Sequence, residues 1–164
     1  MTITAPVLIV GGGMSGLTTS LQLAHHGVES IVIERHPSTS HLPKAHTLNP
    51  RSMEVFRQIG IVDDMLQVAV PPKHIQKASW RSSFGGDAPY DRQILVSLDT
   101  FGGGDLTQQY LEASPQPYSS FHQVRLEPFL SAKAEQNPLI DIRFNTEAVS
   151  YEETDGECIT RSEE

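Results

Sequence analysis

The chain has 164 residues, enough for one domain with a hydrophobic core, and a formal net charge of −8 at pH 7. Nucleic-acid phosphates and anionic membranes attract Lys and Arg, so this charge balance argues against both as partners. The single cysteine, Cys158, excludes an internal disulfide, and no apolar run near the N-terminus has the length of a signal peptide or a membrane helix. These features favour a cytoplasmic protein.

Residues 6–34 predict a strand, a glycine turn, a helix and a second strand. The run 7–10 is wholly apolar, as is typical of a strand buried on both faces of a parallel sheet. From Met14 onwards the apolar residues recur at helical spacing, and Gly27 fits the end of that helix. The run 30–34 is the second strand. The four elements together have the size of one βαβ unit, which predicts an α/β fold.

The elements after residue 34 are less regular. Residues 35–49 are polar, and Asn49-Pro50 suits the start of a helix that ends at Gly60. The patterns then predict a short helix over 62–70, strands over 75–80 and 94–98, a turn at 102–104, a helix over 126–136, one or two strands over 140–151, and a hairpin partner beginning at 158–160. Pro128 is expected in the first turn of its helix, because proline lacks the amide that an inner helical position uses.

The glycine turn has the spacing Gly11-x-Gly13-x-x-Gly16. The first glycine permits a tight turn, the second lets a pyrophosphate approach the backbone, and the third lets the helix pack closely on the sheet. Met14 and Ser15 stand in the first helical turn, where free amides and the positive end of the helix dipole attract phosphate. The turn therefore predicts a dinucleotide site.

Glu34 ends the second strand, 18 residues after Gly16. This is close to the spacing at which an acidic residue binds the adenosine ribose hydroxyls of a dinucleotide. The carboxylate disfavours NADP, although the neighbouring Arg35 can accept a 2′-phosphate. The alternative is a structural glycine turn followed by a solvated surface glutamate.

Several segments resemble one known family, the FAD-dependent aromatic-ring hydroxylases, also called single-component flavoprotein monooxygenases. The likeness is greatest to the branch of phenol and chlorophenol monooxygenases. The likeness is carried by five stretches of sequence. They are 7–16, 31–35, Lys44-Ala45-His46-Thr47-Leu48-Asn49-Pro50-Arg51-Ser52-Met53-Glu54, Gln123-Val124-Arg125-Leu126-Glu127-Pro128-Phe129-Leu130 and Arg143-Phe144-Asn145-Thr146-Glu147.

The resemblance implies roles for individual residues. Glu34 would bind the adenosine ribose of FAD, and Lys44 would lie near the flavin or its phosphates. Lys44 replaces the usual Arg of the family, which keeps the charge but loses the bidentate fork. Gln123 would lie near the ribityl chain or the pyrophosphate, or would only cap the helix that follows it. Arg51 is open to either a phosphate role or a structural role.

The resemblance also implies a fold and an activity. The fold would be a Rossmann-like α/β domain with a parallel sheet, incomplete at the C-terminus, because members of the family are several times longer. Residues 1–164 would form the N-terminal part of the FAD-binding domain, and residues 71–118 would be part of an insertion towards a substrate domain. In such enzymes NADPH or NADH reduces the flavin, and the flavin uses O2 to hydroxylate a small phenolic substrate.

Two other functions stay open at this point: an NAD(P)-binding Rossmann oxidoreductase, and a non-catalytic nucleotide-binding fragment. A metal site is not expected, because the histidines at 36, 41 and 46 lack ligand spacing. We name no catalytic residue, since the chemistry belongs to the cofactor. The aromatic residues Trp80, Tyr90 and Tyr110 are expected in core packing rather than in a substrate pocket.

Overall fold

The computed structural model describes residues 2–164. The chain divides into two compact units. The first unit runs up to Ala45 and resumes at His122, continuing to Glu164, and the second unit is His46–Phe121. Each unit is described separately below.

A parallel three-stranded sheet forms the centre of the first unit. Its strands are β1 (Val7–Val10), β2 (Ser30–Ile33) and β7 (Ile140–Arg143), in the order β1-β2-β7. Val10 pairs with Ile33, and Ser30 pairs with Ile140. The expected α/β fold with a parallel sheet is confirmed.

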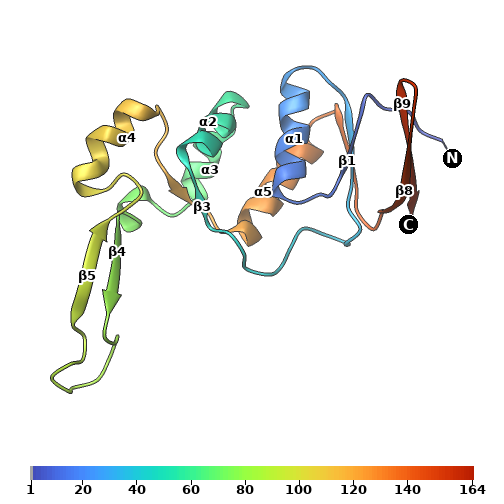
Figure 1. Cartoon of the computed structure of the whole chain (residues 1–164). Coiled ribbons are helices and arrows are strands. Elements are labelled where there is room, and N and C mark those ends of the chain that lie inside the picture. Colours follow the sequence, from blue (N-terminus) through green and yellow to red (C-terminus); the bar gives the residue numbers. More distant parts are fainter. Residues whose placement is uncertain (1) are drawn as a thin grey trace. The chain divides into compact units, whose positions relative to one another are not determined.

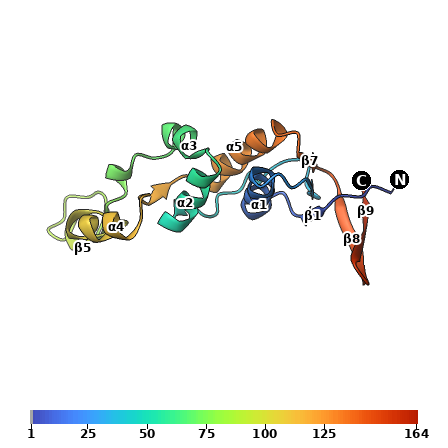
Figure 2. The same ribbon diagram turned by 90° about the horizontal axis from the view of Figure 1, so that it is seen from above.

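Two helices pack together beside this sheet, α1 (Met14–His25) and α5 (Gln123–Glu135), and both views show them side by side (Figures 1 and 2). Each helix repeats small or branched apolar residues at helical spacing, which creates one face for the core. The buried apolar residues on these faces are Leu17, Leu21, Ala24, Leu126, Leu130 and Ala134. The predicted start and inner face of α1 are therefore confirmed.

Helix α5 begins three residues earlier than the sequence predicts, at Gln123 rather than Leu126. Pro128 consequently lies inside the helix and not in its first turn, so that expectation is wrong. The first turn forms over His122, whose carbonyl accepts the amides of Arg125 and Leu126. Pro128 removes one inner hydrogen bond, which would have gone to the carbonyl of Val124.

The chain ends in a hairpin of β8 (Glu147–Thr154) and β9 (Glu157–Glu163), which pair antiparallel (Figure 1). The turn contains Gly156 with φ of +96°, a conformation that favours glycine. Of the one or two strands expected over 140–151, two form, β7 and β8, and the partner expected to begin around 158–160 is confirmed as β9.

The second unit is built on a short ladder and two helices. Strand β3 (Thr47–Leu48) pairs antiparallel with β6 (Ser119–Ser120), and helices α2 (Pro50–Gln58) and α3 (Val62–Val68) follow β3. The side chain of Asn49 accepts a 2.8 Å hydrogen bond from the amide of Ser52, so Asn49 is the N-cap that the sequence predicts. Met53, Phe56 and Met65 are buried.

The remainder of the second unit comprises the 3-10 helix η1 (Pro72–His74), strands β4 (Lys77–Arg81) and β5 (Ile94–Asp99), the 3-10 helix η2 (Gly104–Leu106) and helix α4 (Thr107–Ala113). Strands β4 and β5 form the long antiparallel hairpin visible in Figure 1. The sequence patterns did not predict α4, β3 or β6.

The aromatic residues of the second unit differ from expectation. Trp80 and Tyr90 are 55% and 69% exposed, so the prediction of core packing is wrong for both. Tyr110 instead lies with its ring 5.5 Å from that of Tyr118. Among residues 2–164, no helix has both the length and the apolar character needed to cross a membrane.

Candidate dinucleotide site

A pocket of about 670 Å3 opens in the first unit, at the carboxyl ends of β1 and β2. It is lined by the segments 10–13, 33–42 and 146–148, together with Lys44 and Glu127. In parallel α/β sheets this edge is where ligands bind, because the loops after the strands converge there. The pocket has the size typical of small-molecule sites.

The glycine turn forms the wall next to β1. Gly11 has φ of +110°, and its amide donates a 2.8 Å hydrogen bond to the carbonyl of Ile33 at the end of β2. A Cβ atom placed on Gly16 would lie 2.0 Å from the carbonyl oxygen of Gly11, so only glycine permits this approach of α1 to the turn. The start of α1 is thereby held against the end of β1.

Glu34 lines the pocket immediately after β2. Its Oε2 atom accepts a 2.8 Å hydrogen bond from the amide of Gly12, and its Oε1 atom accepts one of 2.9 Å from the amide of His36. The Nδ1 atom of His36 also lies 2.5 Å from Oε1. The carboxylate is thus fixed between the turn and the next loop.

These contacts determine the charge of Glu34. Partial burial raises the pKa of its carboxyl, but the amides of His36 and Gly12 and the His36 ring outweigh burial and hold the pKa below its usual value of 4.5. Glu34 is therefore ionised at neutral pH, and both of its oxygens are hydrogen-bond acceptors.

A second carboxylate, that of Glu127, contacts the start of α1 directly after the turn. Glu127 of α5 is only 2% exposed. Its Oε1 atom accepts hydrogen bonds from the amide of Met14 at 3.2 Å and from Nε2 of Gln123 at 2.6 Å. Its Oε2 atom accepts the amide of Ser40 at 3.0 Å. Every oxygen of this buried carboxylate is hydrogen-bonded.

The two basic residues predicted for the site both line the pocket and are exposed. Arg35 has its Nη1 atom 4.0 Å from Oε1 of Glu147, at the start of β8. Lys44 follows the loop that contains Ser40. Both cations can reach an anionic ligand from the solvent side, because their side chains are long and flexible.

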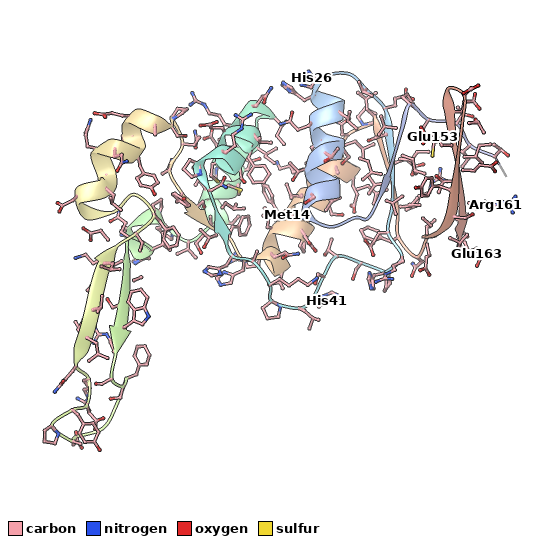
Figure 3. All side chains as sticks on the ribbon, in the orientation of Figure 1. Met14, His26, His41, Glu153, Arg161 and Glu163 are labelled. Carbon is pink, nitrogen blue, oxygen red and sulfur yellow. The ribbon has the colours of Figure 1, made fainter. Side chains whose placement is uncertain are left out.

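The remaining predicted residues lie at helix starts. Gly13 lines the pocket, and Met14 is the first residue of α1, at the end opposite His26 (Figure 3). Ser15 is exposed in the first turn of α1, where amides lack an intrahelical acceptor. Gln123 begins α5, and its Oε1 atom accepts the amide of Ala45 at 3.3 Å. Gln123 is thus bound to Glu127 and Ala45.

Sequence reasoning missed four contributors to this site: Gly12, His36, Ser40 and Glu127. Gly12 is buried, and a Cβ atom there would lie 2.9 Å from that of Glu34. A signal for Glu127 existed, because Glu127 precedes the apolar Leu130 and Ala134 by three and seven residues and so shares their side of the predicted helix. Nothing local indicates Ser40, whose bond to Glu127 spans 87 residues.

Together, the glycine turn at a helix start, the ionised acid after β2 and the pocket between them fit the two halves of an ADP group. The helix end suits a pyrophosphate, and Glu34 suits a ribose with free hydroxyls. Fold and site define a dinucleotide-binding α/β domain of the Rossmann type.

Residues 4–162 match the FAD binding domain family. The chain belongs to this family, which agrees with the resemblance that the sequence motifs indicate.

Individual relatives share most of this chain. It is 37% identical to aklavinone 12-hydroxylase DnrF of Streptomyces peucetius subsp. caesius, over 94% of this chain and 31% of that protein. It is 30% identical to 4-methyl-5-nitrocatechol 5-monooxygenase of Burkholderia sp, over 96% of this chain and 27% of that protein. The chain thus spans about a third or less of the length of these relatives.

A solved structure agrees in fold. The flavin-dependent monooxygenase PieE, in complex with FAD and substrate, is 35% identical and superposes with a TM-score of 0.90, over 98% of this chain and 27% of that chain. The similarity extends over both units of the present chain.

Proposed function

We propose that this chain is the part of a flavoprotein monooxygenase that binds the ADP portion of FAD. The observation that carries the proposal is the junction of the glycine turn and Glu34, where the amide of Gly12 binds the carboxylate at the edge of the pocket. The family match and the flavin-dependent relatives support FAD over the two nicotinamide cofactors.

Each predicted residue has a role in this proposal. Glu34 accepts hydrogen bonds from the adenosine ribose hydroxyls, and Gly11, Gly13 and Gly16 shape the turn in front of the pyrophosphate. The amides of Met14 and Ser15 belong to the helix end that faces the phosphates.

The side-chain cations complete the phosphate site. Arg35 and Lys44 supply positive charge at the solvent side of the pocket, where both side chains are exposed. Gln123 acts indirectly, because one of its N–H groups binds Glu127 and its oxygen binds the amide of Ala45. Gln123 would therefore hold the start of α5 beside the pocket.

We propose that the whole protein hydroxylates an aromatic ring with O2, using NADPH or NADH as reductant. The relatives support this class, since they include an aklavinone hydroxylase and a nitrocatechol monooxygenase. FAD would supply the redox chemistry once it is bound and reduced. The residues of this chain would bind and orient it.

The second unit, His46–Phe121, contains the 71–118 segment, which we assign to an insertion towards the substrate domain. Its β4–β5 hairpin supports this role, because it leaves apolar side chains such as Trp80, Ile94 and Leu95 more than half exposed. A cytoplasmic location is part of the same proposal, since NADPH and NADH are available there.

The proposal is tested with the purified chain and four ligands: FAD, ADP, NADH and NADPH. We expect FAD to bind, with quenching or enhancement of flavin fluorescence, and ADP to displace it completely, because the structure's contacts lie around the ADP portion. We expect NADPH to bind more weakly than NADH, since its 2′-phosphate would approach the carboxylate of Glu34.

Two results would contradict the proposal. Clear binding of NADH without binding of FAD would favour a Rossmann oxidoreductase. FAD binding that excess ADP leaves unchanged would place the flavin somewhere other than this pocket.

A further inference from the structure

Glu127 is a buried carboxylate in the middle of α5 that joins three separate segments. Its oxygens accept the amide of Met14 at the start of α1, the amide of Ser40 in the loop after β2, and Nε2 of Gln123 one turn earlier in α5. The bonds to Met14 and Ser40 span 113 and 87 residues. Glu127 also lines the pocket.

This placement is unfavourable by itself. Burying a carboxylate costs free energy unless its oxygens are hydrogen-bonded, and here they are. The charge also lies at the helix end that, in the proposed function, attracts a pyrophosphate, so Coulomb repulsion alone would weaken nucleotide binding. We therefore expect Glu127 to favour nucleotide binding in another way that offsets this repulsion.

We propose that Glu127 is a positioning residue that holds the nucleotide pocket in its open, preformed shape before the nucleotide arrives. The inference rests on the proposed function and names the group that organises its site. Glu127 fixes the start of α1 and the loop around Ser40 against α5. A preformed site binds more tightly because less conformational entropy is lost on binding.

The loop after β2 is the segment that this hydrogen bond to Glu127 would hold in place. Residues 36–42 form one wall of the pocket and contain no helix or strand. The amide of Ser40 binds Glu127 Oε2, whereas the neighbouring His41 is exposed. One charge-assisted hydrogen bond to a buried carboxylate therefore connects the centre of this loop to the core.

The variant Glu127→Gln isolates this effect. Both oxygens of Glu127 face N–H donors, so the amide group of Gln must direct its own NH2 at one of those donors. The oxygen of Gln keeps two donors if it takes the place of Oε1, so the NH2 group faces the amide of Ser40. The change thus removes the hydrogen bond to Ser40 and one negative charge at nearly constant volume. Glu135→Gln is the matched control, because Glu135 lies on the same helix, is exposed, and accepts the hydroxyl of Ser131.

Two measurements test the proposal. In hydrogen exchange without nucleotide, we expect faster exchange of the Ser40 amide in Glu127→Gln, with the buried core of α1 and α5 still protected. In titration with ADP, we expect binding about tenfold weaker in Glu127→Gln and unchanged in Glu135→Gln. The direction of the change in ADP affinity is informative, since loss of the negative charge alone would strengthen ADP binding.

Stronger ADP binding by Glu127→Gln, or unchanged exchange at Ser40, would overturn the proposal. If the variant does not fold, the unmodified chain decides: the proposal requires the Ser40 amide to exchange more slowly than that of His41. The exchange experiment involves no nucleotide. If the Ser40 amide is protected but the chain binds neither ADP nor FAD, the proposed function is contradicted. The result would then show only that Glu127 holds the loop against the core.

Discussion

Glu34 Oε2 accepts a 2.8 Å hydrogen bond from the amide of Gly12, so the acid after β2 is bound to the glycine turn after β1. The two residues are 22 positions apart in the sequence and meet because β1 and β2 are adjacent parallel strands. Their carboxyl ends lie at the same edge of the sheet. This contact defines the pocket wall on which the first two predictions depend.

We expect Glu34→Gln to bind ADP at least about tenfold more weakly than the unmodified chain, because the amide accepts fewer hydrogen bonds and carries no charge. Isothermal titration measures the difference. Glu29→Gln is the control, since Glu29 is exposed just before β2. Equal affinities for the Glu34 and Glu29 variants would show that the ribose does not contact Glu34.

The stability contribution of Glu34 should disappear in acid. Its folded-state pKa lies below 4.5, because the hydrogen bonds from His36 and Gly12 outweigh burial. A lowered pKa stabilises the folded state above the unfolded pKa, and this stabilisation is lost as the pH falls through the folded pKa. The difference in unfolding free energy between the unmodified chain and Glu34→Gln should therefore be constant near neutral pH and shrink below about pH 4.5. Urea titrations across this range measure it, and a difference that grows in acid would contradict the assignment.

Gly16→Ala should destabilise the first unit. The new Cβ atom would lie 2.0 Å from the carbonyl oxygen of Gly11, so α1 must move away from the turn. We expect a loss of about 1–3 kcal/mol, despite the better helix propensity of alanine. Gly85→Ala is the control, because a Cβ atom there meets nothing within 4 Å. Thermal unfolding compares the two, and an unchanged Tm for Gly16→Ala would exclude the tight packing.

Asn49→Ala should cost about 1 kcal/mol through loss of the N-cap of α2. The Asn49 side chain accepts the amide of Ser52 at 2.8 Å, and alanine offers no acceptor. Asn49→Asp keeps an acceptor and should retain the stability. Chemical denaturation of the three proteins measures the effect, and equal losses for both variants would point to a cause other than capping.

Trp80 should report a solvent-exposed indole. It is the single tryptophan of the chain and is 55% exposed on β4. We expect red-shifted emission in the folded chain and efficient quenching by acrylamide, with little further shift on unfolding. Blue-shifted emission that acrylamide barely quenches would show that the β4–β5 hairpin is covered in solution.

Local patterns in the sequence predicted the βαβ unit beside the pocket. The apolar run of β1, the helical spacing from Met14 and the glycine motif all act over short distances, so they identify the βαβ unit and place Glu34 at its end. The N-cap at Asn49 is local in the same way. The motifs around Lys44 and Gln123 indicated the family, and residues 4–162 match the FAD binding domain family.

Local patterns did not predict helix ends or side-chain exposure correctly where these depend on contacts with residues distant in the sequence. The start of α5 was misplaced because Pro128 indicated a first-turn position, whereas hydrogen bonds around His122 and the Gln123–Glu127 pair extend the helix backwards. The exposed positions of Trp80 and Tyr90 were also missed, since composition does not reveal which face of a hairpin is covered.

The sequence by itself determined the strand–turn–helix–strand unit and its acid, because hydrophobic periodicity and glycine spacing are properties of neighbouring residues. Only the tertiary structure decided that β7 pairs with β2 and that Glu127 reaches Met14 and Ser40, 113 and 87 residues away. Those contacts depend on how the helices and the sheet pack together, and a buried carboxylate finds its donors only after that packing has formed.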